Sequence, residues 1–201
     1  MEVLVVERGL IVFADYVCPY CRLAEAAVEQ LRGNGIAVEA AAFELRPAGT
    51  PALSPDEPWM RAAWEQHVGP LASRLGVTMR MPPLVPRTAK AHEAAAFARS
   101  QGALRDMHAA VYAAYWEDGR DIGRIDVLTE IAEEVGLEPG AMRVALDIDQ
   151  FTDRVAADRA VAARLGLSGV PAFVRTGSDG DLRTGLQTYD ELKAWVTQND
   201  V

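Results

Sequence analysis

The first 45 residues contain two short apolar runs separated by one amphipathic stretch. Residues 9–16, "GLIVFADY", form an apolar run closed by polar residues, which is typical of a buried strand. Residues 36–43, "IAVEAAAF", alternate with period two and predict another strand. Between them, residues 19–32 have the spacing of an amphipathic helix, which Gly33 and Gly35 end. This order of strand, helix and strand favours a parallel strand pair, as in half of a thioredoxin-type core.

A helical block follows over residues 47–165. Its composition shifts to alanine-rich sequence that is interrupted by glycine and proline. Ser54 with Glu57 fits a capping box for a first helix, which Pro58 and the pair Gly69–Pro70 should bend or split. Four further stretches have helical period and end at a glycine: residues 88–102, 104–119, 126–136 and 153–166.

The chain returns to strand character after this block. Residues 170–176 and 181–184 flank the turn sequence "GSDG", which predicts a β-hairpin. Thr188 with Glu191 fits a capping box for a last helix that runs through Val196. The C-terminal part therefore supplies two strands and a helix to the same core as the N-terminal part.

These elements predict an α/β fold: a thioredoxin-like core, with a mixed sheet flanked by helices, carrying a large all-helical insertion. The core is expected to consist of residues 1–46 and 166–201. The insertion is expected at residues 47–165, with its last helix leading back into the core. The first residues, "MEVLVV", are a further candidate strand at the edge of the sheet.

Composition narrows the range of partners. Of the 201 residues, 50% are hydrophobic and 24% are charged, the balance of an ordinary globular protein. The net charge of -9 opposes binding to phosphate backbones, so nucleic acid is not an expected partner. No apolar run approaches the roughly 18 residues of a membrane span, and the N-terminus has neither a basic segment nor a small-residue cleavage site. We expect a cytoplasmic protein with no membrane partner.

Cys18 and Cys21, in the sequence "CPYC", are the two cysteines of the chain. In a Cys-x-x-Cys motif the sulfurs close into a disulfide with little backbone movement when the first cysteine starts a helix. The helix N-terminus directs backbone N–H groups and the positive end of the helix dipole at Cys18, which stabilises its thiolate. We therefore predict that Cys18 is the nucleophile and that Cys21 is the resolving thiol of a mixed disulfide. Pro19 suits the first helical position because its missing N–H leaves no hydrogen bond unmade there.

Two other uses of the cysteine pair have less support. Cys-x-x-Cys is half of many zinc sites, but a second pair is absent and His67, His92 and His108 lie far apart in sequence, so no metal is expected. Two incidental buried cysteines would not explain the position at a strand-to-helix junction. In a reducing compartment, two cysteines at this spacing indicate redox chemistry rather than a structural disulfide.

A second feature lies far along the chain. The sequence "GVP", residues 169–171, stands at the start of the strand that returns to the core, where a proline is tolerated. A cis peptide bond between Val170 and Pro171 would explain this position, but only about 5–6% of bonds before proline are cis. The residues alone therefore leave both isomers open.

These motifs together resemble a known family. "CPYC" after a strand, "FELRP" after the next one, "YWEDGRDIG", "LTEIAEEVGL" and "LGLSGVPAFV" are similar to DsbA-like thiol:disulfide oxidoreductases of the cytoplasmic FrnE-type subgroup. The resemblance spans nearly the whole chain. It implies a thioredoxin core interrupted by a helical domain, with Cys18 as nucleophile, Cys21 as its partner and a cis Pro171 beside the disulfide. It also implies that the backbone of Val170 pairs with an extended peptide or thiol substrate.

The residues between the cysteines differ from those frequent in this subgroup. Pro19 and Tyr20 match the glutaredoxin motif, so we expect both to contact substrate. The same match leaves glutathione open as a co-substrate, and no other cofactor is expected. Where many relatives carry Asn, before the helix predicted at residues 88–102, this chain has Arg87.

Three functions are compatible with these features. The first is a dithiol oxidoreductase that acts on disulfides or thiols of proteins or small molecules. The second is a glutathione-dependent isomerase or transferase of the hydroxychromene-carboxylate isomerase or kappa-class type. Such relatives activate glutathione with a single Ser or Cys, so Cys21 argues against this function. The third is a non-catalytic partner-binding module, which has no use for a redox pair. We predict the first, in a monomer or a homodimer.

Overall fold

The computed structural model describes residues 9–177 and 181–198. The strand expected at the very N-terminus lies outside the described residues. The chain forms two compact units: the described parts of residues 1–45 and 159–201 form one, and residues 46–158 form the other. The second boundary lies inside a helix, α8 (Thr152–Arg164), whereas the sequence placed it at that helix's end. Each unit is described by itself below.

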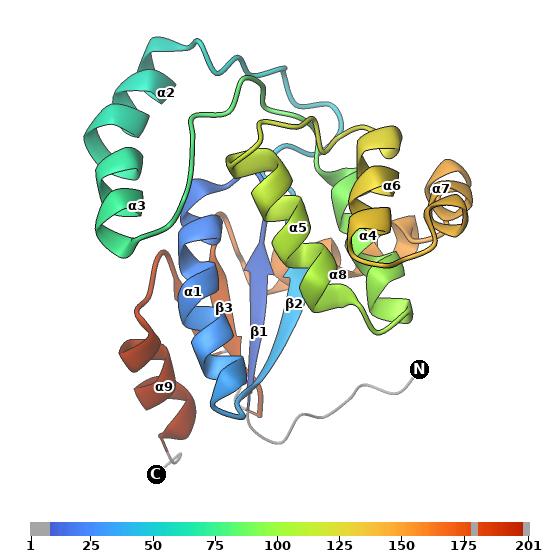
Figure 1. Cartoon of the computed structure of the whole chain (residues 1–201). Helices are drawn as coiled ribbons and strands as arrows, with labels where there is room; N and C mark the ends of the chain where they lie inside the picture. The colour runs from blue at the N-terminus through green and yellow to red at the C-terminus, as the bar shows by residue number, and fades with distance from the viewer. Residues whose placement is uncertain (1–8, 178–180, 199–201) are drawn as a thin grey trace. The chain divides into compact units, whose positions relative to one another are not determined.

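Among the described residues, the first unit contains a mixed sheet of four strands, and the mixed sheet is as predicted (Figure 1). Its strands are β1 (Gly9–Ala14), β2 (Ala37–Ala42), β3 (Ala172–Arg175) and β4 (Leu182–Thr184). Across the sheet the order is β2-β1-β3-β4, with β1 parallel to β2 and antiparallel to β3. The parallel pair predicted from the first 45 residues is confirmed. β3 and β4 form the predicted antiparallel pair, and part of the turn between them lies outside the described residues.

Helices cover both faces of this sheet. α1 (Pro19–Gly33) and α9 (Tyr189–Thr197) pack on one face, and the end of α8 packs on the other. Alternation along β1 directs Leu10 and Val12 toward α1 and α9, and Phe13 toward α8. Each large apolar side chain that is fully buried in this way contributes about 1.5–3 kcal/mol. The core on the α1 side contains Leu10, Val12, Ala24, Ala27, Val28, Leu31, Phe173, Leu192, Trp195 and Val196.

The second unit is helical throughout its regular structure. Three of the helices predicted from periodicity are present within a few residues of their expected bounds: α4 (Ala89–Ser100), α5 (Leu104–Trp116) and α6 (Ile125–Glu134). The alanine-rich sequence serves packing, because alanines on the inner faces of α4 and α5 are almost fully buried. Periodicity and a glycine stop were therefore sufficient to locate these helices.

The sequence pattern did not predict one helix of this unit, α7 (Pro139–Asp147). The sequence "LEPG" before it has the proline and glycine of a chain break. In the structure Pro139 takes the first helical position, and the Glu138 carboxylate accepts hydrogen bonds from the N–H groups of Gly140 and Ala141. The same residues that suggest a break therefore begin a helix.

The helix predicted to be capped by Ser54 starts later. α2 (Pro58–Ala63) begins at its proline, and the Ser54 hydroxyl accepts a hydrogen bond from the Asp56 N–H at 3.1 Å instead. A helix capped by Ser54 would need an N–H at position 58, which proline lacks. Glu57 has a ψ of 128°, outside the helical region, as expected for a residue before proline. The capping-box prediction is wrong because Pro58 fixes the start of the helix.

The Gly69–Pro70 pair interrupts the helix in an unusual way. After α2 the chain continues through a π-helical turn, η1 (Trp64–Val68), into α3 (Gly69–Leu75). In an unbroken α-helix Pro70 would leave the carbonyl four residues earlier without a donor, and its ring would collide with that carbonyl. The wider turn relieves this conflict, with the Gly69 N–H donating to the Trp64 carbonyl five residues earlier. The predicted interruption is thus a local change of the backbone hydrogen bonding, from a spacing of four residues to one of five.

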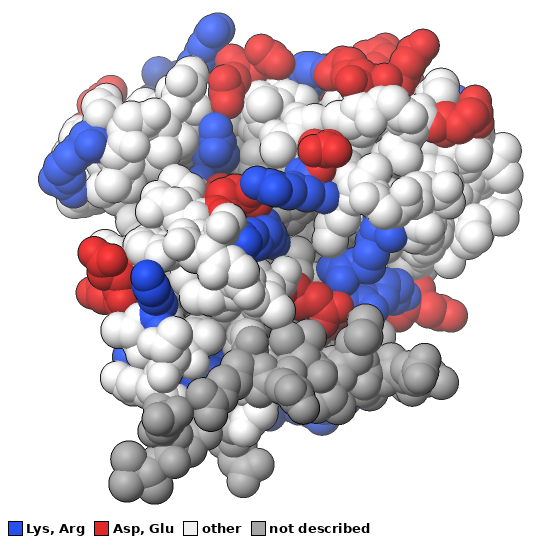
Figure 2. Space-filling view, turned by 60° about the horizontal axis from the view of Figure 1, so that its bottom comes forward, with Lys and Arg blue, Asp and Glu red and all other residues white. Residues whose placement is uncertain are grey.

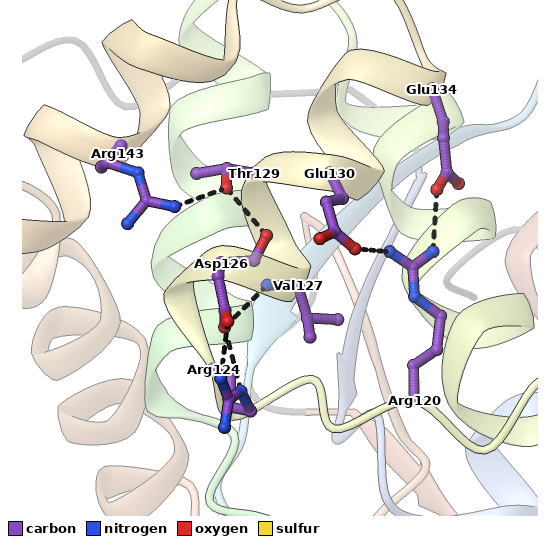
Figure 3. A network of polar contacts seen from close by, with 8 residues as sticks. All are labelled: Arg120, Arg124, Asp126, Val127, Thr129, Glu130, Glu134 and Arg143. Carbon is purple, nitrogen blue, oxygen red and sulfur yellow. Dashed lines mark hydrogen bonds and ion pairs between the residues drawn. The ribbon is translucent and has the colours of Figure 1, made fainter.

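Ion pairs on α6 fix the segment that precedes this helix (Figure 3). Arg120 donates to Glu130 at 2.9 Å and to Glu134 at 2.8 Å, one turn apart on α6. Arg124 donates to both carboxylate oxygens of Asp126, and this hydrogen bonding is the main cause that lowers the Asp126 pKa to about 2. Because these carboxylates are exposed to solvent, the pairs orient the segment more than they stabilise the fold.

On the face shown in Figure 2, basic and acidic side chains are interspersed. Within residues 9–177 and 181–198, no helix has both the length and the apolar character needed to cross a bilayer.

The predicted capping box of the last helix is present and can be tested. The Thr188 hydroxyl accepts from the Glu191 N–H at 3.3 Å, and the Glu191 carboxylate accepts from the Thr188 N–H at 2.8 Å. We expect Thr188→Ala to lower the free energy of unfolding in urea by about 1 kcal/mol. Thr188→Ser, which keeps the hydroxyl, should stay near wild type. Equal losses in both variants would contradict the capping role.

The same capping box predicts a pH dependence. The N–H of Thr188 is the main cause that lowers the Glu191 pKa. A lowered folded-state pKa adds stability above the ordinary glutamate pKa, and this stability disappears as the pH falls through the folded-state value. The stability difference between wild type and Glu191→Gln should therefore shrink in acid. A difference that does not change between neutral and acidic pH would contradict this effect.

Candidate active site at the start of helix α1

The two cysteines lie at the start of helix α1, just after the end of strand β1. After Ala14 the chain turns, and the Cys18 N–H donates to the Asp15 carbonyl at 3.1 Å. Cys18 is the N-cap of α1, with an extended conformation (φ -85°, ψ 116°), and Pro19 takes the first helical position. Cys21 lies one turn further along, with its N–H donating to the Cys18 carbonyl at 3.1 Å. The predicted placement of both thiols at the helix start is thus observed.

The cysteines and the residues between them differ in exposure. Cys18 and Cys21 are free thiols, 4% and 1% exposed. Pro19 is half-buried, and Tyr20 is among the exposed large apolar side chains at 37%. Both cysteines are therefore buried, and Tyr20 is the exposed side chain of the motif.

The Cys18 thiolate is stabilised by its neighbours. The main cause that lowers the Cys18 pKa is the hydrogen bond that the Cys21 thiol donates to it. The backbone N–H groups of Cys21 and Tyr20 lower this pKa further, as a helix N-terminus does. Burial of the sulfur and the negative charge of Asp15 act in the opposite direction and raise the pKa, but the net result is a lowered value.

The pKa of Cys21 is shifted in the opposite direction. Its burial is the main cause that raises the Cys21 pKa well above the ordinary thiol value. The hydrogen bond that it donates to Cys18 also favours its protonated form, and so does the negative charge of the Cys18 thiolate. The two environments therefore favour the thiolate at Cys18 and the thiol at Cys21.

A loop from the far end of the sequence completes the site. The Val170–Pro171 peptide bond is cis, and Pro171 leads into β3, whose Ala172 pairs with Phe13 of β1. The Val170 carbonyl accepts a hydrogen bond from the Cys18 thiol, with a sulfur-to-oxygen distance of 3.4 Å. Pro171 is buried and Val170 half-buried. The structure thus brings Val170 to Cys18 across most of the sequence.

Asp15 is a member of this site that the sequence analysis missed. In the sequence it is a polar residue that closes an apolar run, yet in the structure it is fully buried, at 0% exposure. Its carboxylate accepts a hydrogen bond from the Leu45 N–H at 2.8 Å, and its charge raises the pKa of both cysteines. The available signal was the position of an acidic residue three places before Cys18, at the end of a strand with no other charge.

Arg87, which precedes α4, has a structural role in the helical unit. Its guanidinium donates to the carbonyls of Arg46 and Pro47, each at 2.7 Å, and to both the hydroxyl and the carbonyl of Thr50. These bonds occupy the guanidinium and hold the loop of residues 46–50 against the start of α4. As for metals, the residues that the structure describes contain no group of three His, Cys, Asp or Glu side chains placed to hold an ion.

Comparison with known sequences gives a family. Residues 9–196 match the DSBA-like thioredoxin domain. The uncharacterised protein YwbO of Bacillus subtilis is 34% identical over 169 residues, which cover 81% of this chain and 84% of that protein.

Solved structures share the fold. A probable DsbA oxidoreductase of Streptomyces coelicolor, SCO1869, aligns with a TM-score of 0.78 and 23% identity over 96% of this chain and 92% of that one. A 2-hydroxychromene-2-carboxylate isomerase aligns with a TM-score of 0.75 and 16% identity over 92% and 91%. The cytosolic disulfide reductase DsbM of Pseudomonas aeruginosa, whose structure is also known with GSH, aligns with a TM-score of 0.64 and 22% identity over 94% and 92%.

The different pKa directions of the two thiols predict different reactivity. With the protein reduced and folded, iodoacetamide should modify Cys18 with an inflection below the ordinary thiol pKa, because only the thiolate reacts. Cys21 should stay largely unmodified until denaturant is added. Peptide mass spectrometry after quenching at each pH assigns the label, and urea-unfolded protein is the control. A common inflection for both cysteines in the folded protein would contradict the site.

Proposed function

Because the chain belongs to the family of DsbA-like thioredoxin domains, we propose that it is a thiol-disulfide oxidoreductase in which Cys18 and Cys21 cycle between dithiol and disulfide. The asymmetry of the pair carries this proposal. A thiolate is favoured at the less buried sulfur and a thiol at the more buried one, which suits a nucleophile and a resolving group. The observed fold alone would also suit other chemistry.

The first step forms a mixed disulfide. The Cys18 thiolate attacks one sulfur of a substrate disulfide, a new bond joins these sulfurs, and the substrate bond breaks. The second substrate sulfur leaves as a thiolate and takes a proton from solvent. Loss of the Cys18 proton also frees the Val170 carbonyl from the thiol, so this carbonyl can accept an N–H from an extended substrate.

The second step releases the substrate. Cys21 gives up its proton, and its sulfur attacks the Cys18 sulfur of the mixed disulfide. A bond between Cys18 and Cys21 forms as the substrate leaves with its second thiol. The substrate has gained two electrons and the protein has lost two. A thiol reductant must then return the protein to the dithiol, and in the opposite direction a disulfide oxidant drives the same steps backward.

We propose glutathione as this thiol co-substrate and the cytoplasm as the compartment. Support comes from Pro19 and Tyr20 between the cysteines and from DsbM, a cytosolic disulfide reductase by name whose structure is known with GSH. Tyr20 is exposed beside Cys18, where an apolar surface can pack against a peptide or the glutathione backbone. Pro19, Val170 and Pro171 are proposed to form the remaining contacts with substrate.

A second function has one supporting observation. A 2-hydroxychromene-2-carboxylate isomerase shares the fold over most of this chain. An isomerase of that kind on this scaffold would use Cys18, or glutathione bound beside it, and would have no role for Cys21. The oxidoreductase therefore requires the Cys21 thiol, whereas the isomerase does not.

Single serine substitutions separate these functions. Cys18→Ser should lower the turnover of a small disulfide with glutathione by at least about 100-fold, because a hydroxyl is not ionised there. Cys21→Ser should keep the attack but lose release, so an adduct of substrate or glutathione on Cys18 should accumulate. Intact mass spectrometry measures this adduct. Full turnover by Cys21→Ser without an adduct would contradict the dithiol mechanism and favour the monothiol isomerase.

A further inference from the structure

Helix α7 carries apolar side chains on two faces. One face buries Met142, Ala145 and Leu146 where α7 packs on α4 and α6 (Figure 1). The opposite face presents Val144, which is 60% exposed, and continues to Ile148, which follows the helix directly and is 65% exposed. A helix at the surface normally has polar residues on its outer face. Apolar residues on both faces of α7 therefore indicate that a further surface packs on it.

The outer apolar residues form one continuous stripe. Ala141, Val144 and Ile148 follow one another at spacings of three and four residues, which places them on the same side of a helix. All three are exposed, and Ile148 is the most exposed large apolar side chain among the described residues. We refer to these three residues as the α7 stripe. Covering the stripe would remove two large apolar side chains from water.

Two opposite charges flank the α7 stripe on one side. Arg143 and Asp147 are exposed and lie one helical turn apart. Arg143 donates to the Thr129 hydroxyl at 3.3 Å, whereas the Asp147 carboxylate forms no hydrogen bond or ion pair with another described residue. Asp147 also ends α7, where the negative end of the helix dipole disfavours an acidic group. A cation from outside this part of the chain would stabilise that carboxylate.

A second copy of the chain has the complementary surface. In an antiparallel pair of α7 helices related by a twofold axis near Val144, this residue meets the partner's Val144. The same register sets Ala141, the smallest residue of the stripe, against the partner's Ile148. It also sets Arg143 against the partner's Asp147, and the symmetry forms this ion pair twice. Both the apolar stripe and its charged flank are therefore self-complementary.

A parallel pair of α7 helices lacks this match. Rotation about an axis along the helices places the charged flanks of the two copies on opposite sides of the contact. The Arg143 and Asp147 side chains then stay unpaired across it. Each chain carries a net charge of -9, so two copies repel unless the contact brings opposite charges together. The charges therefore select the antiparallel arrangement.

We propose that α7 is a self-association surface through which two copies of the chain form a weak homodimer. The contact consists of two antiparallel α7 stripes and two ion pairs between Arg143 and Asp147. One helix of 9 residues from each copy makes a small interface, which is typical of weak and reversible association. The contact lies in the helical unit and does not involve the chemistry of Cys18 and Cys21.

Sedimentation velocity on the full chain tests this association. With a reductant present to exclude disulfide-linked dimers, wild type should pass from monomer to dimer between about 10 μM and 1 mM. Val144→Glu places two like charges at the axis and should weaken dimerisation by at least about 10-fold. Trp59→Glu is the matched control, because it adds the same charge at another 60% exposed side chain of this unit. It should dimerise like wild type.

Charge reversal tests the antiparallel register. Arg143→Glu and Asp147→Arg each set like charges against each other, so each should weaken dimerisation by about 10-fold. The double variant restores both ion pairs in reversed order and should recover to within about 3-fold of wild type. Asp147→Arg also improves the charge at the end of α7, so its monomer should unfold at a higher temperature than wild type. A merely structural role of Asp147 would not weaken the dimer while stabilising the monomer.

Three results would overturn the inference. The first is a wild-type protein that stays monomeric up to about 1 mM. The second is dimerisation that Val144→Glu leaves unchanged or that Trp59→Glu weakens equally, because the copies would then meet through another face. The third is a double variant that dimerises no better than the single charge reversals. None of these measurements depends on turnover of a disulfide, so they remain decisive if the proposed function fails.

Discussion

The hydrogen bond from the Cys21 thiol to the Cys18 thiolate is the interaction on which the site depends. It is the main cause of the lowered Cys18 pKa, and it helps to raise the Cys21 pKa. One contact therefore divides two chemically identical groups into an attacking and a resolving thiol. The contact forms because Pro19 and Tyr20 complete a single helical turn between the cysteines, with the N-cap at Cys18.

The sheet of the first unit brings residues that are distant in sequence to the start of α1. β1 ends immediately before the turn that leads to Cys18, and its antiparallel neighbour β3 begins immediately after the cis Val170–Pro171 bond. The strand register thus brings the Val170 carbonyl to the Cys18 sulfur from 152 residues away in sequence. The parallel neighbour β2 ends at the same edge, where the Leu45 N–H holds the Asp15 carboxylate. Three strand ends therefore define the surroundings of one sulfur.

Local patterns in the sequence were sufficient for most elements and for the thiol pair. Strand alternation, helical period and the Thr188 capping box depend on neighbouring residues, and each has its counterpart in the structure. The start of α2 and the presence of α7 were missed because Pro58 and Pro139 act as first helical residues, where proline favours a helix. Asp15 could not be assigned to the site from sequence, because its burial and its contact with the Leu45 N–H depend on the fold.

The central claim is that Cys18 and Cys21 form one reversible two-electron couple. It is tested most directly by equilibrating the wild-type protein at a series of glutathione to glutathione disulfide ratios, quenching with acid and measuring intact mass. The account predicts one transition that depends on the square of the glutathione concentration over that of its disulfide, with loss of two hydrogen atoms on oxidation. A protein that instead collects stable glutathione adducts, with the second cysteine still a free thiol, would contradict it.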